Sequence, residues 1–191
     1  MRIKYSTADR KVADIDENGV IKGVAPGVTT IYYTANDGNG VTSECKVIVR
    51  NPEVEYVGDI YYLFDKAKKV ATVTSIYGGK NKSLEAEKVA QVYTGTVSIP
   101  EQTTFNAVTY DVKKVGGYAF TCQNTLQALR VGAFVEKIED NAATKAMNLN
   151  RVTVANASQL VTVGKRSFMD CAGLQHVLFE GTTQYLDVID T

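Results

Sequence analysis

Apolar residues recur at fixed positions in the last third of the chain, and their spacing indicates a structural repeat. Three segments align without gaps: VGGYAFTCQNTLQALRV (115–131), IEDNAATKAMNLNRVTV (138–154) and VGKRSFMDCAGLQHVLF (163–179). The first residues are Val115, Ile138 and Val163, so the period is 23 and then 25 residues. A period in the twenties with fixed apolar positions predicts a solenoid, whose coils bury their apolar faces against one another.

Further apolar positions lie five, eleven, fourteen and sixteen residues after the first one in each repeat. The steps of five and six residues predict a short helical turn, and the final alternation predicts a short strand. If positions fourteen and sixteen point inward, positions thirteen and fifteen point outward. The outward positions form a candidate ligand-binding face, with an ordinary solvated sheet face as the alternative: Ala128, Arg130, Arg151, Thr153, His176 and Leu178.

The first 50 residues predict short strands separated by turns. Their sequences are KVADI, GVIKGV, VTTIYYTA and ECKVIVR. Asn51-Pro52 marks a boundary, beyond which DIYYLFD and KVATVTSIY predict a hairpin through residues 66–69. Residues 78–91 are polar and predict either a short helix or a surface loop, and GTVSIP and AVTYDV predict further strands.

The stretch DIDENG, residues 14–19, has two interpretations. Asp14, Asp16, Asn18 and Gly19 fit the first half of a calcium loop, but Ala25 stands where the closing glutamate belongs. Asn-Gly flanked by alternating apolar residues is a strong hairpin signal. We therefore expect the turn of a β-hairpin.

Charge and composition exclude several classes of protein. The 191 residues contain 21 Lys plus Arg and 21 Asp plus Glu, which argues against nucleic acid or an anionic membrane surface as the main partner. No apolar run approaches the ~20 residues of a membrane-spanning helix, and the start lacks the apolar core of a signal peptide. The length allows one or two domains.

The three cysteines, Cys45, Cys122 and Cys171, form neither a zinc pattern nor a disulfide framework. We expect buried free thiols, with a Cys122–Cys171 bridge as the alternative.

The sequence predicts no catalysis, no cofactor and no metal site. His176 is the only histidine, and the chain has no nucleophile elbow, phosphate-binding loop or zinc-protease motif. The carboxylates spaced two apart, Asp14 with Asp16 and Glu85 with Glu87, are expected to be solvated surface groups.

The repeat resembles the BspA-like leucine-rich repeat of bacterial surface proteins. The last copy carries the resemblance best, through Val163-Gly164, Ser167-Phe168, Cys171, Leu174 and Val177. The middle copy departs from the pattern at Glu139, Ala143 and Ala146, and the first copy has Gln123 in the cysteine position, with Cys122 one place early.

Residues 5–49 resemble a second family, the bacterial Ig-like domain of group 2. The match runs through VADIDENGVIKG and ends on the KVIV strand. The strands that normally precede this point are missing, so the resemblance implies a partial sandwich and a piece of a longer protein.

Together these observations predict a mostly β protein: a partial Ig-like β-sandwich followed by a short leucine-rich-repeat solenoid with short helical turns. The expected domains are residues 1–51 (Ig-like) and 52–191 (repeat domain). The repeat domain divides into a β-rich lead-in or cap (52–112), three repeats (113–179) and a tail or cap (180–191). If the last repeat is uncapped, we expect edge-to-edge association.

The resemblances imply a secreted or cell-surface protein of a bacterium that acts in adhesion or recognition. The Ig-like unit would be a spacer, and the partner would be a host or bacterial surface protein or glycan. An accessory targeting or spacer module of a secreted polysaccharide-acting enzyme is the alternative. A stalk without any ligand is a third possibility.

Overall fold

The computed structural model describes residues 3–37, 40–155, 159–181 and 187–188. These residues fall into two compact units, residues 1–51 and 52–191. The protein is mostly β.

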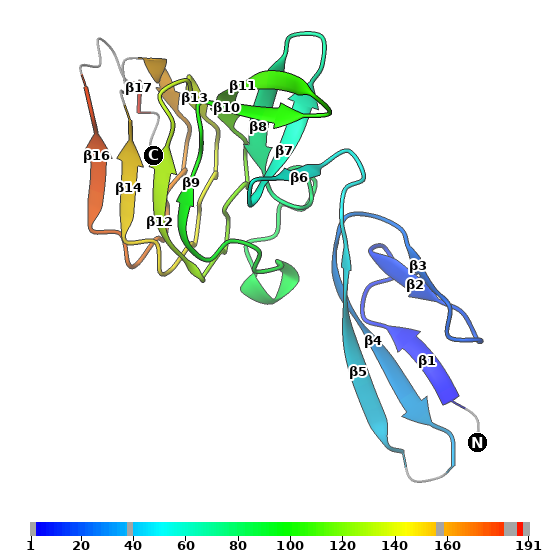
Figure 1. The fold of residues 1–191 in the computed structure, drawn as a ribbon. Coiled ribbons are helices and arrows are strands. Elements are labelled where there is room, and N and C mark those ends of the chain that lie inside the picture. The colour runs from blue at the N-terminus through cyan, green and yellow to red at the C-terminus, as the bar shows by residue number, and fades with distance from the viewer. Residues whose placement is uncertain (1–2, 38–39, 156–158, 182–186, 189–191) are drawn as a thin grey trace. The chain divides into compact units, whose positions relative to one another are not determined.

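The first unit has a three-stranded antiparallel sheet in the order β1-β4-β5 and a separate hairpin, β2–β3 (Figure 1). Its strands are β1 (Ile3–Thr7), β2 (Ala13–Ile15), β3 (Ile21–Gly23), β4 (Gly27–Ala35) and β5 (Thr42–Val49). The sequence predicted the last four of these strands and missed β1.

The hairpin predicted at DIDENG is confirmed. Ile15 pairs with Ile21, and the Asp16 carboxylate accepts hydrogen bonds from the backbone N–H groups of Asn18 (2.9 Å) and Val20 (2.8 Å). Gly19 has φ +83°, and a Cβ there would lie 2.9 Å from the ring of Tyr5. The turn therefore requires glycine at this position.

Cys45 is exposed, so its predicted burial is wrong. It pairs with Ile31, which is fully buried, and both side chains point to the same face of the sheet. The difference arises because β5 is the edge strand of this sheet in the described residues, so no further strand covers its outer side.

The second unit contains two sheets. The strands are β6 (Glu55–Val57), β7 (Ile60–Asp65), β8 (Val70–Thr74), β9 (Gly95–Ser98), β10 (Gln102–Phe105), β11 (Val108–Val115), β12 (Leu126–Val131), β13 (Lys137–Ile138), β14 (Arg151–Val154), β15 (Thr162–Val163), β16 (His176–Phe179) and β17 (Asp187–Val188). One sheet has the order β17-β15-β13-β11-β8-β7-β6, with β10 paired to β11, and the other has the order β16-β14-β12-β9. The predicted β7–β8 hairpin is confirmed.

Between β8 and β9 the chain is mostly turn and loop. Within the polar stretch 78–91, helix is confined to the single 3-10 turn η1 (Ala86–Lys88).

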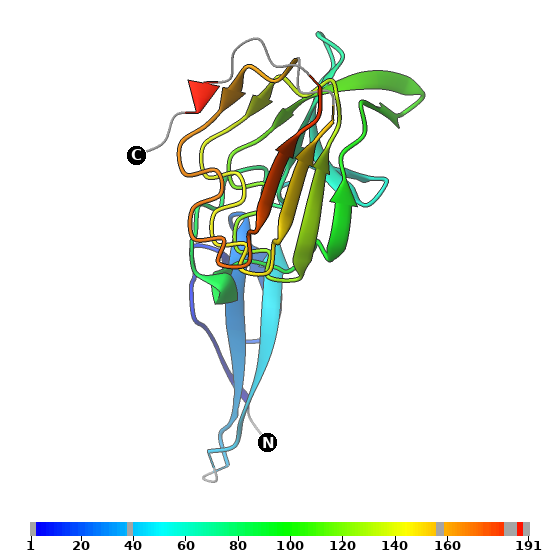
Figure 2. The same ribbon diagram turned by 90° about the vertical axis from the view of Figure 1, so that its left-hand side faces the viewer.

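Successive coils cross from the first sheet to the second, and their strands pair in parallel (Figure 2). The register agrees with the alignment of the repeats, because Val115 pairs with Ile138 and Ile138 with Val163. Val73 pairs with Val115 in the same way, so β8 and β9 form an additional coil before the repeats that the sequence did not reveal. After the repeats, Val163 pairs with Val188.

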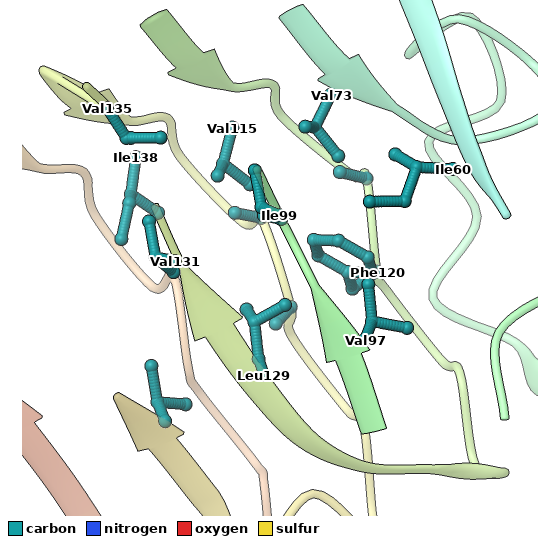
Figure 3. Close-up of a cluster of buried hydrophobic side chains, with 14 of the residues drawn as sticks. Ile60, Val73, Val97, Ile99, Val115, Phe120, Leu129, Val131, Val135 and Ile138 are labelled. Atoms are coloured by element: carbon teal, nitrogen blue, oxygen red, sulfur yellow. The ribbon is translucent and has the colours of Figure 1, made fainter. Parts of the chain in front are cut away.

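The core of this unit lies between the two sheets. Val97 and Ile99 of the first coil and Leu129 and Val131 of the next face side chains such as Val115 from the other sheet (Figure 3). Each of these residues is buried, so the coils share one continuous apolar core.

The predicted helical turns are wrong. The segments between strands are turns that contain a left-handed residue at positions three and seven of every repeat. These residues, with φ between 55° and 61°, are Tyr118 and Cys122, Asn141 and Lys145, and Arg166 and Asp170. A left-handed residue every four positions prevents a continuous helix. The backbone bonds to the next coil instead, as from Phe120 N to Ala142 O (2.7 Å) and from Ala143 N to Ser167 O (2.7 Å).

Gln123 joins the first repeat to the irregular coil before it. Its Oε1 accepts hydrogen bonds from the N–H groups of Val92 (2.8 Å) and Tyr93 (3.0 Å), and its Nε2 donates to Ala90 O (2.7 Å). The equivalent residue in the third repeat is Cys171, whose thiol donates to Ala143 O (3.1 Å). Glutamine stands in the cysteine position because it satisfies three backbone groups, two of them buried.

The thiols of Cys122 and Cys171 are free and buried, which confirms the expectation for these two residues. The alternative, a bridge between them, is not formed. Burial raises the pKa of Cys171 to about 11 and also raises the pKa of Cys122.

The described part of the tail is short. Most of residues 180–191, the predicted tail or cap, lies outside the described residues.

We predict that Gln123→Ala lowers the free energy of unfolding by about 3 kcal/mol, because three backbone groups, two of them buried, lose their partner. Urea unfolding measures the change. Gln127→Ala, at an exposed position of the same segment, is the control and should change stability by less than about 0.5 kcal/mol. Equal effects of the two substitutions would show that the hydrogen bonds of Gln123 contribute nothing specific.

We predict that a thiol reagent at about pH 8 modifies Cys45 rapidly and the other two cysteines only after unfolding, because the thiolate is the reactive form. Native Cys45→Ser protein should therefore show no fast phase, and a fast phase in this variant would contradict the prediction.

Between pH 9 and 11 the unfolded Cys171 thiol ionises while the native one keeps its proton. The free energy of unfolding should therefore fall as pH rises through this window.

Candidate functional site

The six residues of the predicted binding face come together on one side of the β16-β14-β12-β9 sheet. They form two rows across the strands, one of Ala128, Arg151 and His176 and one of Arg130, Thr153 and Leu178. Thr96 and Ser98 of β9 extend the rows, because they pair with Ala128 and Arg130. We call these eight residues the sheet face.

The sequence analysis missed Thr96 and Ser98 because β9 belongs to a coil that does not align with the repeats. A signal was present in GTVSIP, where Val97 and Ile99 alternate with polar residues as in the last strand of each repeat.

Exposure differs along the sheet face. Arg130, Arg151, His176 and Leu178 are exposed and Ala128 is half-buried, but Thr153 is only 7% exposed. Thr153 lies on the outer face of the sheet, but neighbouring side chains cover it. The prediction that Thr153 is an accessible contact residue is therefore wrong.

The low exposure of Thr153 is explained by the neighbouring Arg130 side chain and its ion pair. Arg130 Nη2 lies 3.6 Å from Glu180 Oε2, and Glu180 follows β16 while Arg130 lies on β12. The ion pair therefore spans the intervening strand β14 beside Thr153. Both partners are about half exposed, and pairs of this kind contribute little to stability.

Arg151 and His176 are neighbours in the first row and both are exposed. Within the described ranges, Arg151 has no ion pair. Its guanidinium can therefore bind a carboxylate or sulfate of a ligand with two parallel hydrogen bonds. Leu178, in the other row, is 42% exposed and offers an apolar surface to a ligand.

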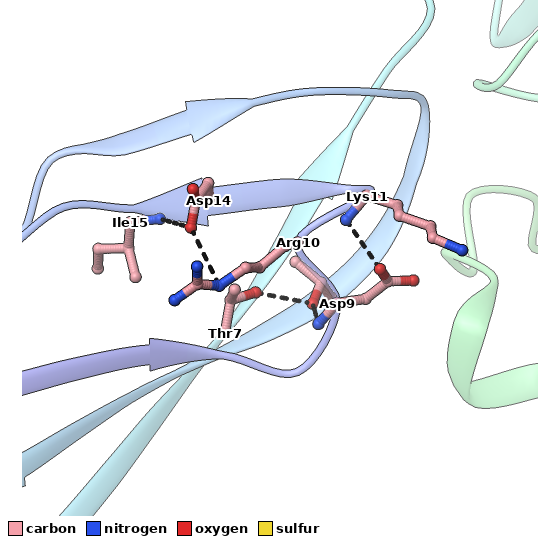
Figure 4. A network of polar contacts seen from close by, with 7 residues as sticks. Thr7, Asp9, Arg10, Lys11, Asp14 and Ile15 are labelled. Atoms are coloured by element: carbon pink, nitrogen blue, oxygen red, sulfur yellow. Dashed lines mark hydrogen bonds and ion pairs between the residues drawn. The ribbon is translucent and has the colours of Figure 1, made fainter.

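The spaced carboxylates of the first unit, Asp14 and Asp16, accept hydrogen bonds from nearby backbone N–H groups. Asp14 Oδ1 accepts a hydrogen bond from Ile15 N (2.9 Å) and lies 3.7 Å from Arg10 Nε, close to a turn in which Lys11 N donates to Asp9 Oδ1 (2.9 Å; Figure 4). Local backbone bonds of this kind are typical of Asp in turns.

In the second unit, Glu85 Oε2 lies 2.6 Å from Lys88 Nζ, and this contact lowers the pKa of Glu85. Across the residues that the structure describes, no group of three or more His, Cys, Asp or Glu is placed to hold a metal ion. Nor does this part of the chain include a helix long and apolar enough to cross a bilayer.

The first unit is similar in sequence to a known family of domains. Residues 2–47 match the family model of the bacterial Ig-like domain (group 2).

Part of the chain is similar in structure to leucine-rich repeat proteins. One is a leucine-rich repeat protein from Bacteroides ovatus, with 16% identity and a TM-score of 0.50 over 74% of this chain and 37% of that chain. Another is a leucine rich cell surface protein from Faecalibacterium prausnitzii, with 24% identity and a TM-score of 0.48 over 68% of this chain and 33% of that chain. At 16% identity, the first likeness establishes the fold alone.

A curated enzyme shares part of the sequence. The A type blood N-acetyl-alpha-D-galactosamine deacetylase of Flavonifractor plautii is 36% identical over 77 residues, which are 40% of this chain and 9% of that enzyme. This chain thus spans about a third of the two solved structures and less than a tenth of the deacetylase.

We predict that the 191-residue chain associates through the edge of β16. All four residues of this strand are exposed, and β16 is the last strand of its sheet in the described residues. Unpaired edges with apolar side chains favour strand addition from another chain. Light scattering should show association that rises with concentration and is reduced by Leu178→Lys. The matched control is Val108→Lys, which should not change it. A monomer at high concentration would count against the prediction.

Proposed function

We propose that this chain is a non-catalytic recognition module of a bacterial cell-surface protein. The Ig-like unit acts as a spacer, and the second unit is a short leucine-rich-repeat solenoid that presents the sheet face to a ligand. The observation that carries the proposal is the register of the parallel strands, which aligns outward side chains of neighbouring coils into two rows. Aligned faces of this kind are the surfaces that repeat proteins use for binding.

The chemistry of the sheet face favours an acidic partner. Arg151 and His176 lie side by side, and Arg130 forms an exposed ion pair with Glu180 that a ligand can replace. A surface protein or glycan that carries carboxylate or sulfate groups fits this arrangement.

Localisation at the cell surface or outside the cell is part of the same proposal. The match of residues 2–47 to a bacterial Ig-like domain supports it. The structural likeness to a leucine-rich repeat protein supports the solenoid fold.

An accessory module of a secreted enzyme that acts on polysaccharide is the second candidate. The 36% identity over 77 residues to a deacetylase named for a blood-group sugar supports it. In this case the two units would target or space a catalytic domain elsewhere in the protein. The rest of the gene distinguishes the candidates, because a glycan-modifying domain in the same protein would favour the accessory role.

We predict that the double substitution R130E/R151E weakens binding to surface-coated mucin, a glycoprotein rich in acidic glycans, by at least about tenfold. The reason is that both arginines present positive charge on one face. Binding of the labelled protein is measured against mucin concentration.

The matched control is K137E/K165E, which changes the net charge equally at exposed positions outside the sheet face. This variant should bind like the unmodified protein. Equal loss in both variants would reduce the interaction to nonspecific charge attraction. Undiminished binding by R130E/R151E would remove the sheet face from the proposal.

A further inference from the structure

A hollow lies beside β9, next to the sheet face but outside the residues that the repeats predicted. Its volume is about 400 Å³, which falls within the ~300–1,000 Å³ of small-molecule sites. One wall is the β6–β7 hairpin, with Tyr56 and Asp59, and the other wall runs from Val92 to Ser98. Both walls belong to the second unit.

Tyr56 forms a flat aromatic platform at the hollow. Tyr56 is 52% exposed. Its ring packs on Tyr61, its partner across the hairpin, with ring centroids 4.7 Å apart. Its hydroxyl donates a hydrogen bond to Asp59 Oδ1 (3.0 Å).

Tyr61 is itself held in place by Tyr93. Its backbone N–H donates to the hydroxyl of Tyr93 (3.2 Å), and the two rings meet edge to face. Tyr93 is buried and donates its own hydroxyl proton to Thr74 O (2.8 Å). The platform is therefore fixed before any ligand arrives, which lowers the entropy cost of binding.

The opposite wall supplies donors and acceptors. Thr94, Thr96 and Ser98 are exposed and line the hollow. The backbone N–H groups of Gly95 and Ile99 bond to the β12 side. In a parallel ladder, the alternate residues Thr96 and Ser98 then direct their own N–H and C=O groups toward the open edge.

We propose that this hollow is a binding subsite for a neutral saccharide. A sugar ring has an apolar C–H face that packs on an aromatic ring, and hydroxyl groups around its rim that need polar partners. Tyr56 offers the first surface, and the Asp59 carboxylate with the hydroxyls of residues 94–98 offers the second. Asp59 is the only charged residue among those lining the hollow, and its negative charge disfavours acidic sugars.

An extended peptide added to the edge of β9 is the competing occupant. β9 has only four residues, so an added strand would gain few backbone hydrogen bonds. The convergence of a fixed tyrosine, a carboxylate and three hydroxyl side chains favours the saccharide.

This site goes beyond the function proposed for the sheet face, because it takes a neutral ligand on Tyr56, Asp59 and Thr94. It shares only Thr96 and Ser98 with the sheet face. The test is an array of neutral hexose and N-acetylhexosamine oligosaccharides, printed with sialylated and sulfated counterparts and with an extended-peptide library. The full chain is compared with Tyr56→Ala and Asp59→Asn. Asparagine tolerates the left-handed conformation of Asp59 (φ 65°), so the second variant keeps the hairpin intact.

We expect binding to neutral oligosaccharides, a loss of at least about tenfold for Tyr56→Ala and a weaker loss for Asp59→Asn. Tyr118→Ala, which removes a tyrosine away from the hollow, and R130E/R151E should leave this binding unchanged. On titration with the bound sugar, backbone NMR signals of residues 58–59 and 94–98 should shift.

Three results would overturn the proposal. One is the absence of binding to any neutral oligosaccharide at millimolar concentration. Another is binding that Tyr56→Ala and Asp59→Asn leave intact while R130E/R151E abolishes it, which would assign the sugar to the sheet face. The third is binding of extended peptides alone, which would make the edge of β9 a strand-addition site.

Discussion

The parallel register between successive coils is the constraint on which the second unit depends. Val73, Val115, Ile138 and Val163 pair in sequence along one sheet, and the equivalent alternation runs along the other. A single coil has apolar side chains on one side only, so it is stable only when a neighbour covers them. The same register that closes the core also aligns the outward residues, and the sheet face is therefore a direct result of how the core packs.

The turns between the sheets follow the same constraint. Left-handed residues at two fixed positions direct backbone groups toward the adjacent coil, where they bond to the next turn. Departures from the repeat pattern have local reasons in this arrangement. Gln123 stands in a cysteine position because its side-chain amide bonds three backbone groups of the coil before it. Glu139 stands in a glycine position, and its carboxylate accepts a hydrogen bond from Gly117 N (3.1 Å) in the preceding coil.

The proposed roles divide between two surfaces that share β9. The sheet face presents cationic and apolar side chains in rows, whereas the hollow beside it presents a tyrosine, a carboxylate and hydroxyl groups. These surfaces suit ligands that differ in charge: an acidic ligand on the sheet face and a neutral one in the hollow. A recognition protein that binds complex glycans can use both, because such glycans combine neutral sugars with acidic ones.

The sequence by itself determined the period, the strands of the repeats, the hairpin at DIDENG and the direction in which each side chain of the sheet face points. These features are local, because alternation along a strand decides which side of the sheet a residue occupies. The tertiary structure decided what covers each residue. Thr153 points outward but is buried beside the Arg130–Glu180 pair, and Cys45 faces the same way as Ile31 but is exposed on an edge strand. Coverage and the hollow at Tyr56 depend on residues distant in sequence, which no local pattern records.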